Sequence, residues 1–343
     1  MFIKQRRERV TTTQDTSSEE SDVQEYSTHP GAFANHLFGG LSAGAATLIL
    51  VTLAAVATFL FIEAWPAMSA STAELADKVH WLGDESGETL IATIGFLVYG
   101  TILISAIALL IATPLSVGIA LFISHYAPRK LAQGLGYLID LLAAIPSVVY
   151  GLWGAIVVIP VLQPFYEFLE RYLGWIPLFA AGDDGTVSGT GRVAMSAGIV
   201  LAIMIIPIIT AVTREVFLQT PTLHEEAALA MGATRWEMVK MAVFPFGRSG
   251  MIGATMLGLG RALGETMAVY MILSPGLTFS PYILQSAQHN TIASYIALQF
   301  PEANSDGVSA LITMGLALFV ITLLVNMAAR WVVSRRSEFS GAN

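Results

Sequence analysis

Six apolar stretches, each long enough to cross a lipid bilayer, constrain the fold of this chain more than any other feature. A membrane-spanning helix needs roughly 20 predominantly apolar residues, because its backbone must satisfy its own hydrogen bonds within the hydrocarbon. The stretches occupy residues 41–65, 91–112, 138–161, 193–217, 249–273 and 308–332. Hydrophobic residues make up 55% of the chain and charged residues only 12%, about half the charged share of soluble proteins. The sequence therefore predicts an all-α, multi-pass membrane protein with six transmembrane helices.

Three prolines, Pro114, Pro146 and Pro207 of the fourth stretch, are expected to bend or interrupt these helices, because proline lacks a backbone donor and clashes with the preceding turn. The second stretch extends past Pro114 to Ile123, so it should bend there or continue as a separate short helix. In the third stretch Pro146 is followed by Ser147, and a kink is expected there. Tyr150, one turn further on, is interpreted as a packing residue in preference to one that lines a pathway.

The distribution of basic residues orients the six helices, since cytoplasmic loops are enriched in Lys and Arg. With the N-terminus inside, 13 of the 17 basic residues fall on the cytoplasmic side: Lys4, Arg6, Arg7, Arg9, Arg129, Lys130, Arg214, Arg235, Lys240, Arg248, Arg330, Arg335 and Arg336. Three fall outside: Lys78, Arg171 and Arg192. Arg261 lies within a span. The sequence predicts that both termini are cytoplasmic.

Four regions follow from this pattern. Residues 1–37 are polar and rich in Ser, Thr and Glu, so we expect a disordered cytoplasmic tail. Residues 38–88 hold the first transmembrane helix and an extracytoplasmic loop. Residues 89–333 form a core of five transmembrane helices with a cytoplasmic loop at 220–247, and residues 334–343 form a second cytoplasmic tail.

The chain lacks the residues that several classes of chemistry require. The chain has no cysteine, which excludes disulfides, thiolate catalysis and cysteine-based zinc sites. The histidines have no metal-ligand spacing, and no glycine-rich loop ends in Gly-Lys-Ser/Thr, so no means of hydrolysing ATP is visible. We therefore predict no enzyme activity, no bound cofactor or metal, and no nucleic-acid partner.

The cytoplasmic loop at 220–247 shows signals for two short helices. Thr222 followed by Glu225, and Thr234 followed by Glu237, each match the capping box that starts a helix. Gly232 can end the first helix in a left-handed turn, and Pro245 is expected to close the second. The sequence predicts a stiff protrusion on the cytoplasmic face, which by itself could be merely a well-ordered loop.

The spacing within this loop resembles the EAA loop of ABC-importer permeases, the binding-protein-dependent transport permeases. The matching residues are Glu226, Ala227, Ala228, Gly232 and Pro245, while Ala242 and Phe244 stand where that family usually has Ile and Leu. The resemblance implies that the loop docks into a groove on a cytoplasmic ATPase. Small side chains at Ala227 and Ala228 suit the close approach of such a partner.

Three further segments are similar to phosphate-transporter permeases of the PstC type: LLAAIPSVVYGLWG, MIIPIITAVTREV and GLGRALGETMAV. The resemblance covers roughly residues 89–333. It implies a MetI-like permease fold in the cytoplasmic (inner) membrane. It also implies four kinds of partner besides the lipid bilayer: a second homologous permease subunit, an ATPase dimer, an extracytoplasmic phosphate-binding protein, and inorganic phosphate.

Arg261 and Glu265 lie in the middle of the fifth apolar stretch and need an explanation. A charged side chain at the centre of a membrane helix costs about 2.5–3.5 kcal/mol on insertion scales. In a continuous helix, residues four apart share one face, so one interpretation is an ion pair that locks the helices together. In addition, Gly260 and Gly264 form a GxxxG pattern, which is typical of tight helix packing.

The alternative interpretation makes Arg261 and Glu265 part of a substrate pathway. A guanidinium offers a planar fork of donors that suits phosphate oxygens, and Gly258 and Gly264 would leave room beside it. Glu265 could accept a hydrogen bond from a protonated phosphate oxygen, which sulfate lacks at neutral pH. The residues alone do not separate the pathway from the ion pair, and the family resemblance favours the pathway.

The sequence thus favours the permease subunit of an ATP-driven phosphate importer. One alternative keeps the importer and changes the cargo to another oxyanion, such as sulfate or molybdate. A second alternative is a secondary carrier driven by an ion gradient, with the buried charges as a relay. The loop that resembles an ATPase-docking element argues against the carrier.

Overall fold

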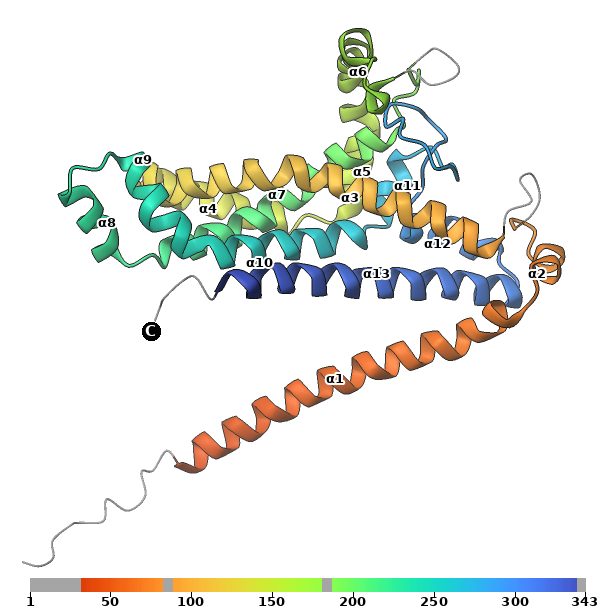
Figure 1. Cartoon of the computed structure of the whole chain (residues 1–343), viewed down its shortest axis with the longest axis horizontal. Coiled ribbons are helices and arrows are strands. Elements are labelled where there is room, and N and C mark those ends of the chain that lie inside the picture. The colour runs from red at the N-terminus through yellow and green to blue at the C-terminus, as the bar shows by residue number, and fades with distance from the viewer. Residues whose placement is uncertain (1–31, 83–88, 181–186, 338–343) are drawn as a thin grey trace, which may run out of the picture. The chain divides into compact units, whose positions relative to one another are not determined.

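The computed structural model describes residues 32–82, 89–180 and 187–337, and throughout those residues the regular structure is helical, without a β-strand (Figure 1). The α-helices are α1 Ala32–Ser69, α2 Thr72–Lys78, α3 Leu90–Leu121, α4 Arg129–Ala143, α5 Ser147–Trp153, α6 Ile159–Leu173, α7 Ala194–Leu218, α8 Thr222–Ala230, α9 Arg235–Met238, α10 Phe244–Leu263, α11 Met267–Ile272, α12 Ile292–Gln299 and α13 Ser305–Ser337. The chain divides into two units, residues 1–56 and 57–343.

Within the described ranges, five helical segments are long and apolar enough to cross a membrane. They are Leu37–Ser69, Leu90–Tyr126, Ser147–Leu173, Ala194–Leu218 and Ser305–Trp331. They correspond to five of the six predicted stretches and confirm a multi-pass membrane protein. The count of six spans and their orientation stay predictions.

The second predicted helix is longer than expected. Helix α3 runs through Pro114 without a break and continues into a π-helical turn, Phe122–Tyr126. The expected separate short helix after Pro114 is therefore wrong. Because an extra residue in a π-helical turn shifts the helix register, such turns redirect the side chains that follow.

The third predicted stretch, 138–161, does not form one helix. Helix α4 ends at Ala143 and α5 starts at Ser147, since the residue before Pro146 is disfavoured in the helical region. The hydroxyl of Tyr150 donates to the carbonyl of Leu142 at 2.9 Å, which also accepts from the amide of Ile145 at 3.3 Å, and so links α5 to the end of α4. The membrane-spanning segment consequently begins at Ser147, not at residue 138, and Tyr150 has the structural role that was predicted.

The fifth predicted stretch, 249–273, is also interrupted. Helix α10 ends at Leu263 with Gly264 at its C-cap, and α11 starts only at Met267. Gly264 has a φ of −94°, so the helix ends there without a left-handed turn. The stretch is therefore two helices with a break between them.

Helix α7 forms the centre of the bundle. In its most apolar window 61% of the residues are buried, about twice the share in α3, α13 and the α5–α6 segment. It packs most closely with α3 and α10, and the three run side by side (Figure 1). Gly198 allows the close approach to α3, because a Cβ there would lie 2.5 Å from a methyl group of Ile107. The position of α10 against this rigid centre fixes the site described below.

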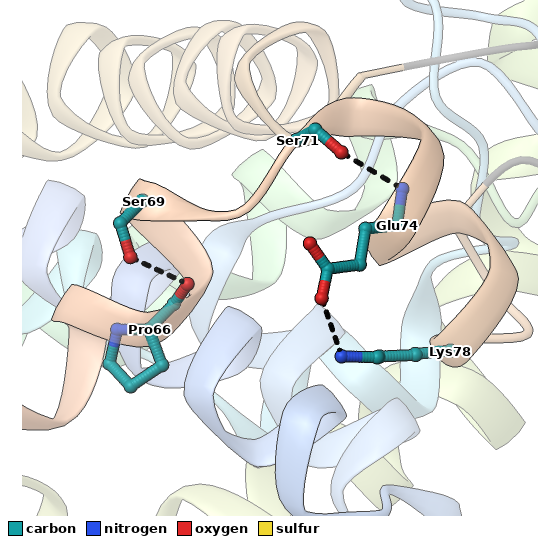
Figure 2. Close-up of polar contacts among 5 residues, drawn as sticks. All are labelled: Pro66, Ser69, Ser71, Glu74 and Lys78. Carbon is teal, nitrogen blue, oxygen red and sulfur yellow. Dashed lines mark hydrogen bonds and ion pairs between the residues drawn. The ribbon is translucent and has the colours of Figure 1, made fainter.

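The turn from α1 into α2 is held by local hydrogen bonds (Figure 2). The Ser69 hydroxyl donates to the Pro66 carbonyl at 3.2 Å, and the Ser71 hydroxyl accepts from the Glu74 amide at 3.3 Å. Lys78 forms an ion pair with Glu74 at 2.8 Å, which lowers the pKa of that exposed carboxyl. These contacts define the N-terminus of α2 as a capped helix start.

Candidate functional site

One face of α10 lines a cavity of about 930 Å³, and Arg261 lies at the end of that face. The α10 residues on the cavity follow helical spacing: Ser249, Ile252, Gly253, Met256, Leu257, Gly260 and Arg261. The opposite side consists of Ile208 from α7 together with Asn326, Ala329 and Arg330 from α13. The cavity is thus a mainly apolar space whose polar lining includes two arginines, Arg261 and Arg330.

The guanidinium of Arg261 is incompletely satisfied. Its Nε atom is buried and has no hydrogen-bond partner within the described parts of the chain. Leaving a buried donor of a charged group unpaired costs more than leaving a neutral one. The arrangement therefore favours an anion or an additional polar group at Arg261.

Glu265 does not share a helix face with Arg261, contrary to the sequence-based expectation. It lies in the break between α10 and α11, is 8% exposed, and accepts a hydrogen bond from the amide of Ala268 at 3.1 Å. No ion pair joins it to Arg261 in the portion of the chain that the structure describes. The prediction of one helical face is wrong because Gly264 ends the helix between the two residues.

The glycines of α10 also differ from the predicted packing. A Cβ at Gly258 would lie 2.6 Å from the Ile209 side chain, so this glycine permits close contact with α7. Gly260 has open space around it, and the nearest atom to a Cβ at Gly264 is the Gly260 carbonyl of the same segment. The expected GxxxG contact through Gly260 and Gly264 is therefore absent from the described chain, and Gly260 instead opens onto the cavity.

The second set of predicted site residues lies in residues 220–247, which we call the coupling loop. Helix α8 begins at Thr222, but its N-cap is Pro221 without a side-chain cap, so the first predicted capping box is wrong. Gly232 has a φ of 87°, which confirms the left-handed turn. The capping box of Thr234 and Glu237 is also confirmed, and the amide of Thr234 lowers the pKa of the Glu237 carboxyl.

Pro245 does not close the second helix. The chain passes from α9 through the π-helical turn Val239–Val243 directly into α10, with Pro245 in the first turn of α10. Proline is tolerated there because the first turn of a helix has no use for its missing donor. The coupling loop is consequently continuous with the helix that carries Arg261.

The side chains of the EAA-like residues point in different directions. Glu226 and Ala227 are exposed, whereas Ala228 is 5% exposed and packs in a cluster with Phe217, Val239 and Val243. Ala228 therefore holds the loop against the bundle and is not available to a partner surface. Leu223 and Met231 are 74% and 80% exposed, so α8 presents apolar side chains to its surroundings.

Two groups that belong to these sites could not be recognised from the sequence. His125, from the π-helical turn after α3, lies 3.3 Å from Glu225 of α8. Asn326 and Arg330 of α13 face the Arg261 cavity. The sequence shows Arg330 in the last apolar stretch, but which residues lie near it depends on how the helices pack. No cluster of potential metal ligands occurs among the residues that the structure describes.

The helices, the cavity and the connected loop define an all-α, multi-pass membrane protein with an arginine on a mainly apolar cavity. The family described as "Binding-protein-dependent transport system inner membrane component" matches residues 112–338, and the chain belongs to this family. It is therefore a transport component of the inner membrane and not an enzyme.

Relatives match over most of their length. The phosphate transport system permease protein PstC 2 of Mycobacterium tuberculosis is 44% identical over 304 residues, which cover 88% of this chain and 92% of that protein. PstC of Mycobacterium leprae is 43% identical over 282 residues, with 82% and 87% covered. PstC of Xylella fastidiosa is 39% identical over 311 residues, with 90% and 94% covered.

Proposed function

We propose that this chain is the membrane-spanning permease subunit of an ATP-driven importer of inorganic phosphate. Relatives that carry the name phosphate transport system permease protein align with most of the chain, at 39–44% identity. The observation that carries the proposal is the Arg261 guanidinium, whose buried Nε lacks a partner beside a cavity of about 930 Å³. Because Arg261 lines the cavity, an oxyanion there would accept from the other N–H groups of the guanidinium.

Arg261 would bind phosphate transiently through its fork of N–H donors. The cavity is mainly apolar, so the attraction acts in a medium of lower dielectric constant than water. Transport also requires release, so the anion must not be held too tightly at Arg261. Asn326 and Arg330, at the other side of the cavity, would receive the anion next.

Glu265 would contribute selectivity. Its Oε1 atom already accepts the Ala268 amide, which fixes the carboxylate in the break between α10 and α11. An ionised carboxylate is an acceptor only, so it would bond a protonated phosphate oxygen and repel a fully deprotonated oxyanion. This role distinguishes phosphate from sulfate at neutral pH.

The coupling loop would transmit the work of a cytoplasmic ATPase. Glu226 and Ala227 are exposed beside the apolar side chains Leu223 and Met231, a combination that suits a protein interface. Gly232 and Pro245 would set the direction of the chain into α10, and Ala228 would hold the loop in place. The complete importer would contain a second homologous permease subunit, an ATPase dimer and an extracytoplasmic phosphate-binding protein.

The test is uptake of labelled phosphate into vesicles that contain the importer with and without this subunit. We expect uptake to require ATP and this chain, and to persist when an excess of sulfate is added. Uptake that continues after the ATPase is inhibited, while a proton gradient is maintained, would indicate a secondary carrier. Competition by sulfate as effective as that by unlabelled phosphate would indicate a different oxyanion as the cargo.

A further inference from the structure

A second pocket, of about 500 Å³, lies between α4, α7 and the π-helical turn Phe122–Tyr126. Its polar lining residues are Ser124, Arg129, Gln133, Tyr137, Asp140 and Arg214. Arg129, Gln133, Tyr137 and Asp140 recur at helical spacing, so one face of α4 forms a wall of the pocket. This pocket shares no lining residue with the Arg261 cavity.

Arg214 enters the pocket from α7 and lies against the backbone of α4. A Cβ added at Gly136 would collide with its Nη1 atom, so a glycine is needed for the guanidinium to lie there. The Nε atom of Arg214 is buried and has no hydrogen-bond partner in the described chain. A buried, unpaired donor of a charged group is costly unless a further acceptor completes it.

We propose that this pocket binds a phosphate group through Arg129 and Arg214. Two guanidinium groups from different helices offer several donors to one oxyanion, and Gln133 and the Tyr137 hydroxyl can donate to its remaining oxygens. The phosphate group can belong to free inorganic phosphate or to an anionic phospholipid, because both present anionic phosphoryl oxygens that accept hydrogen bonds. The site is separate from the transport pathway and does not depend on the identity of the cargo.

Asp140 opposes the anion and sets its position. It lies 11 residues after Arg129, or about 16 Å along the helix axis at 1.5 Å per residue. No ion pair of Asp140 occurs among the described residues, so it does not neutralise Arg214 by direct contact. We place the phosphate group on the Arg129 side of Arg214, away from this carboxylate.

The pocket is connected to the coupling loop through a short chain of hydrogen bonds. Ser124, which lines the pocket, lies 2.7 Å from the Nδ1 atom of His125. The Nε2 atom of the same imidazole lies 3.3 Å from Glu225 in α8. A ligand that contacts Ser124 or tightens the π-helical turn would therefore stabilise α8, so occupancy of the pocket regulates the loop.

The test uses the full-length chain in nanodiscs, in an Arg261→Gln background that removes the other candidate anion site. One arm adds inorganic phosphate to discs of pure phosphatidylcholine. The other arm includes phosphatidylglycerol in the discs and adds no phosphate. The readout is the amide hydrogen exchange of α8, Thr222–Ala230, together with the thermal midpoint.

We expect one arm to slow exchange in α8 and raise the midpoint, and that arm identifies the source of the phosphate group. Arg129→Gln and Arg214→Gln should weaken the apparent affinity about tenfold or more, as for a lost charged hydrogen bond. Asp140→Asn should strengthen it. Lys130→Gln is the matched control, since Lys130 is exposed, adjacent to Arg129 and outside the pocket lining.

The proposal is overturned if neither arm changes exchange in α8, or if Lys130→Gln shifts the titration as much as the two arginine variants. Should Arg214→Gln fail to fold, Arg129→Gln still decides, because Arg129 is exposed at the start of α4. Protection of α8, together with a failure of the chain with Arg261 intact to support phosphate uptake, would refute the proposed cargo and leave this site intact. Phosphate uptake without protection of α8 would refute this site and leave the proposed cargo intact.

Discussion

The imidazole Nε2 atom of His125 lies 3.3 Å from the carboxylate Oε1 atom of Glu225, although 100 residues of chain separate the two. The side chains are only 9% and 22% exposed. The His125 ring also meets the edge of Phe217 in α7, with the ring centroids 6.4 Å apart. Helix α8 of the coupling loop is thus tied to the ends of two membrane-spanning segments, and movement of the loop must pass to both.

This contact predicts how the loop can be uncoupled. Removing one partner of a partly buried hydrogen bond costs about 1 kcal/mol, or roughly fivefold in the population of the anchored loop. We expect His125→Ala and Glu225→Gln to lower the amount of phosphate transported per ATP hydrolysed, with less effect on hydrolysis itself. The measurement is the ratio of uptake to ATP turnover in vesicles.

The control for this prediction is His224→Ala, because His224 is an exposed histidine of α8 itself. That variant should keep the normal ratio. A double-mutant cycle of His125 and Glu225 should give a combined loss smaller than the sum of the two single losses. An unchanged ratio in both single variants would contradict transmission through this pair.

The sequence could predict the elements of the coupling loop but not its anchoring. Capping residues and glycine act on their own neighbours, so the second capping box and the turn at Gly232 were recognisable. The failure at Thr222 arises from Pro221, which takes the N-cap position in its place. The contact of His125 with Glu225 depends on how α3 and α8 are brought together, and no local pattern encodes it.

Because local sequence patterns do not encode tertiary contacts, the prediction that Arg261 and Glu265 share a helix face also failed. Composition predicted a membrane segment with two charges, and that prediction needed no tertiary information. The assumption of a continuous helix then placed the charges on one face. The break at Gly264 could be suspected from helix propensity, but membrane helices often tolerate glycine. The cavity itself involves α7 and α13, so only packing reveals it.

The left-handed backbone at Gly232 predicts that the coupling loop requires glycine at this position. Its φ is 87°, and a Cβ there would meet no atom within 4 Å, so any penalty is backbone strain alone. We expect Gly232→Ala to destabilise the loop by about 1 kcal/mol, and Gly232→Asn to cost less, because asparagine tolerates the left-handed region better. Amide exchange in α8 and α9 measures the effect.

Gly134 provides the comparison for that variant. It also has open space around it, but it lies inside α4 with ordinary helical geometry. Gly134→Ala should leave loop exchange unchanged and stabilise its own helix slightly. Equal effects of the two alanine variants on the loop would show that the left-handed turn is not required.

His289 lies in the loop between α11 and α12 and predicts that the stability of the protein depends on pH. The side chain is 2% exposed, with Nε2 2.7 Å from the Ser280 carbonyl and Nδ1 unpaired within the described chain. Burial lowers the pKa of His289 below its ordinary value of 6.5, although the hydrogen bond with Ser280 acts in the opposite direction. The unfolded chain therefore binds this proton at a higher pH than the folded chain does.

By linkage, the stability associated with neutral His289 is complete above pH 6.5 and is lost as the pH falls through the lower folded pKa. We expect the thermal midpoint of the purified protein to fall between about pH 7.5 and about pH 5.5, and His289→Gln to reduce that fall. His80→Gln is the control, since that imidazole is 60% exposed. A fall of the same size in all three proteins would exclude His289 as its source.

Arg261 gives the most direct test of the proposed pathway. Arg261→Gln removes the charge at similar length, and the loss of a charged hydrogen bond of about 1.5–3 kcal/mol predicts phosphate uptake lower by roughly 10- to 100-fold. Arg261→Lys should recover part of the flux, because lysine restores the charge without the planar fork.

Glu265→Gln should weaken the discrimination against sulfate more than it slows the uptake of phosphate. Arg248→Gln serves as the control, as it removes an exposed arginine of the same helix outside the cavity lining. Normal uptake and selectivity in fully assembled Arg261→Gln and Glu265→Gln proteins would remove both residues from the pathway.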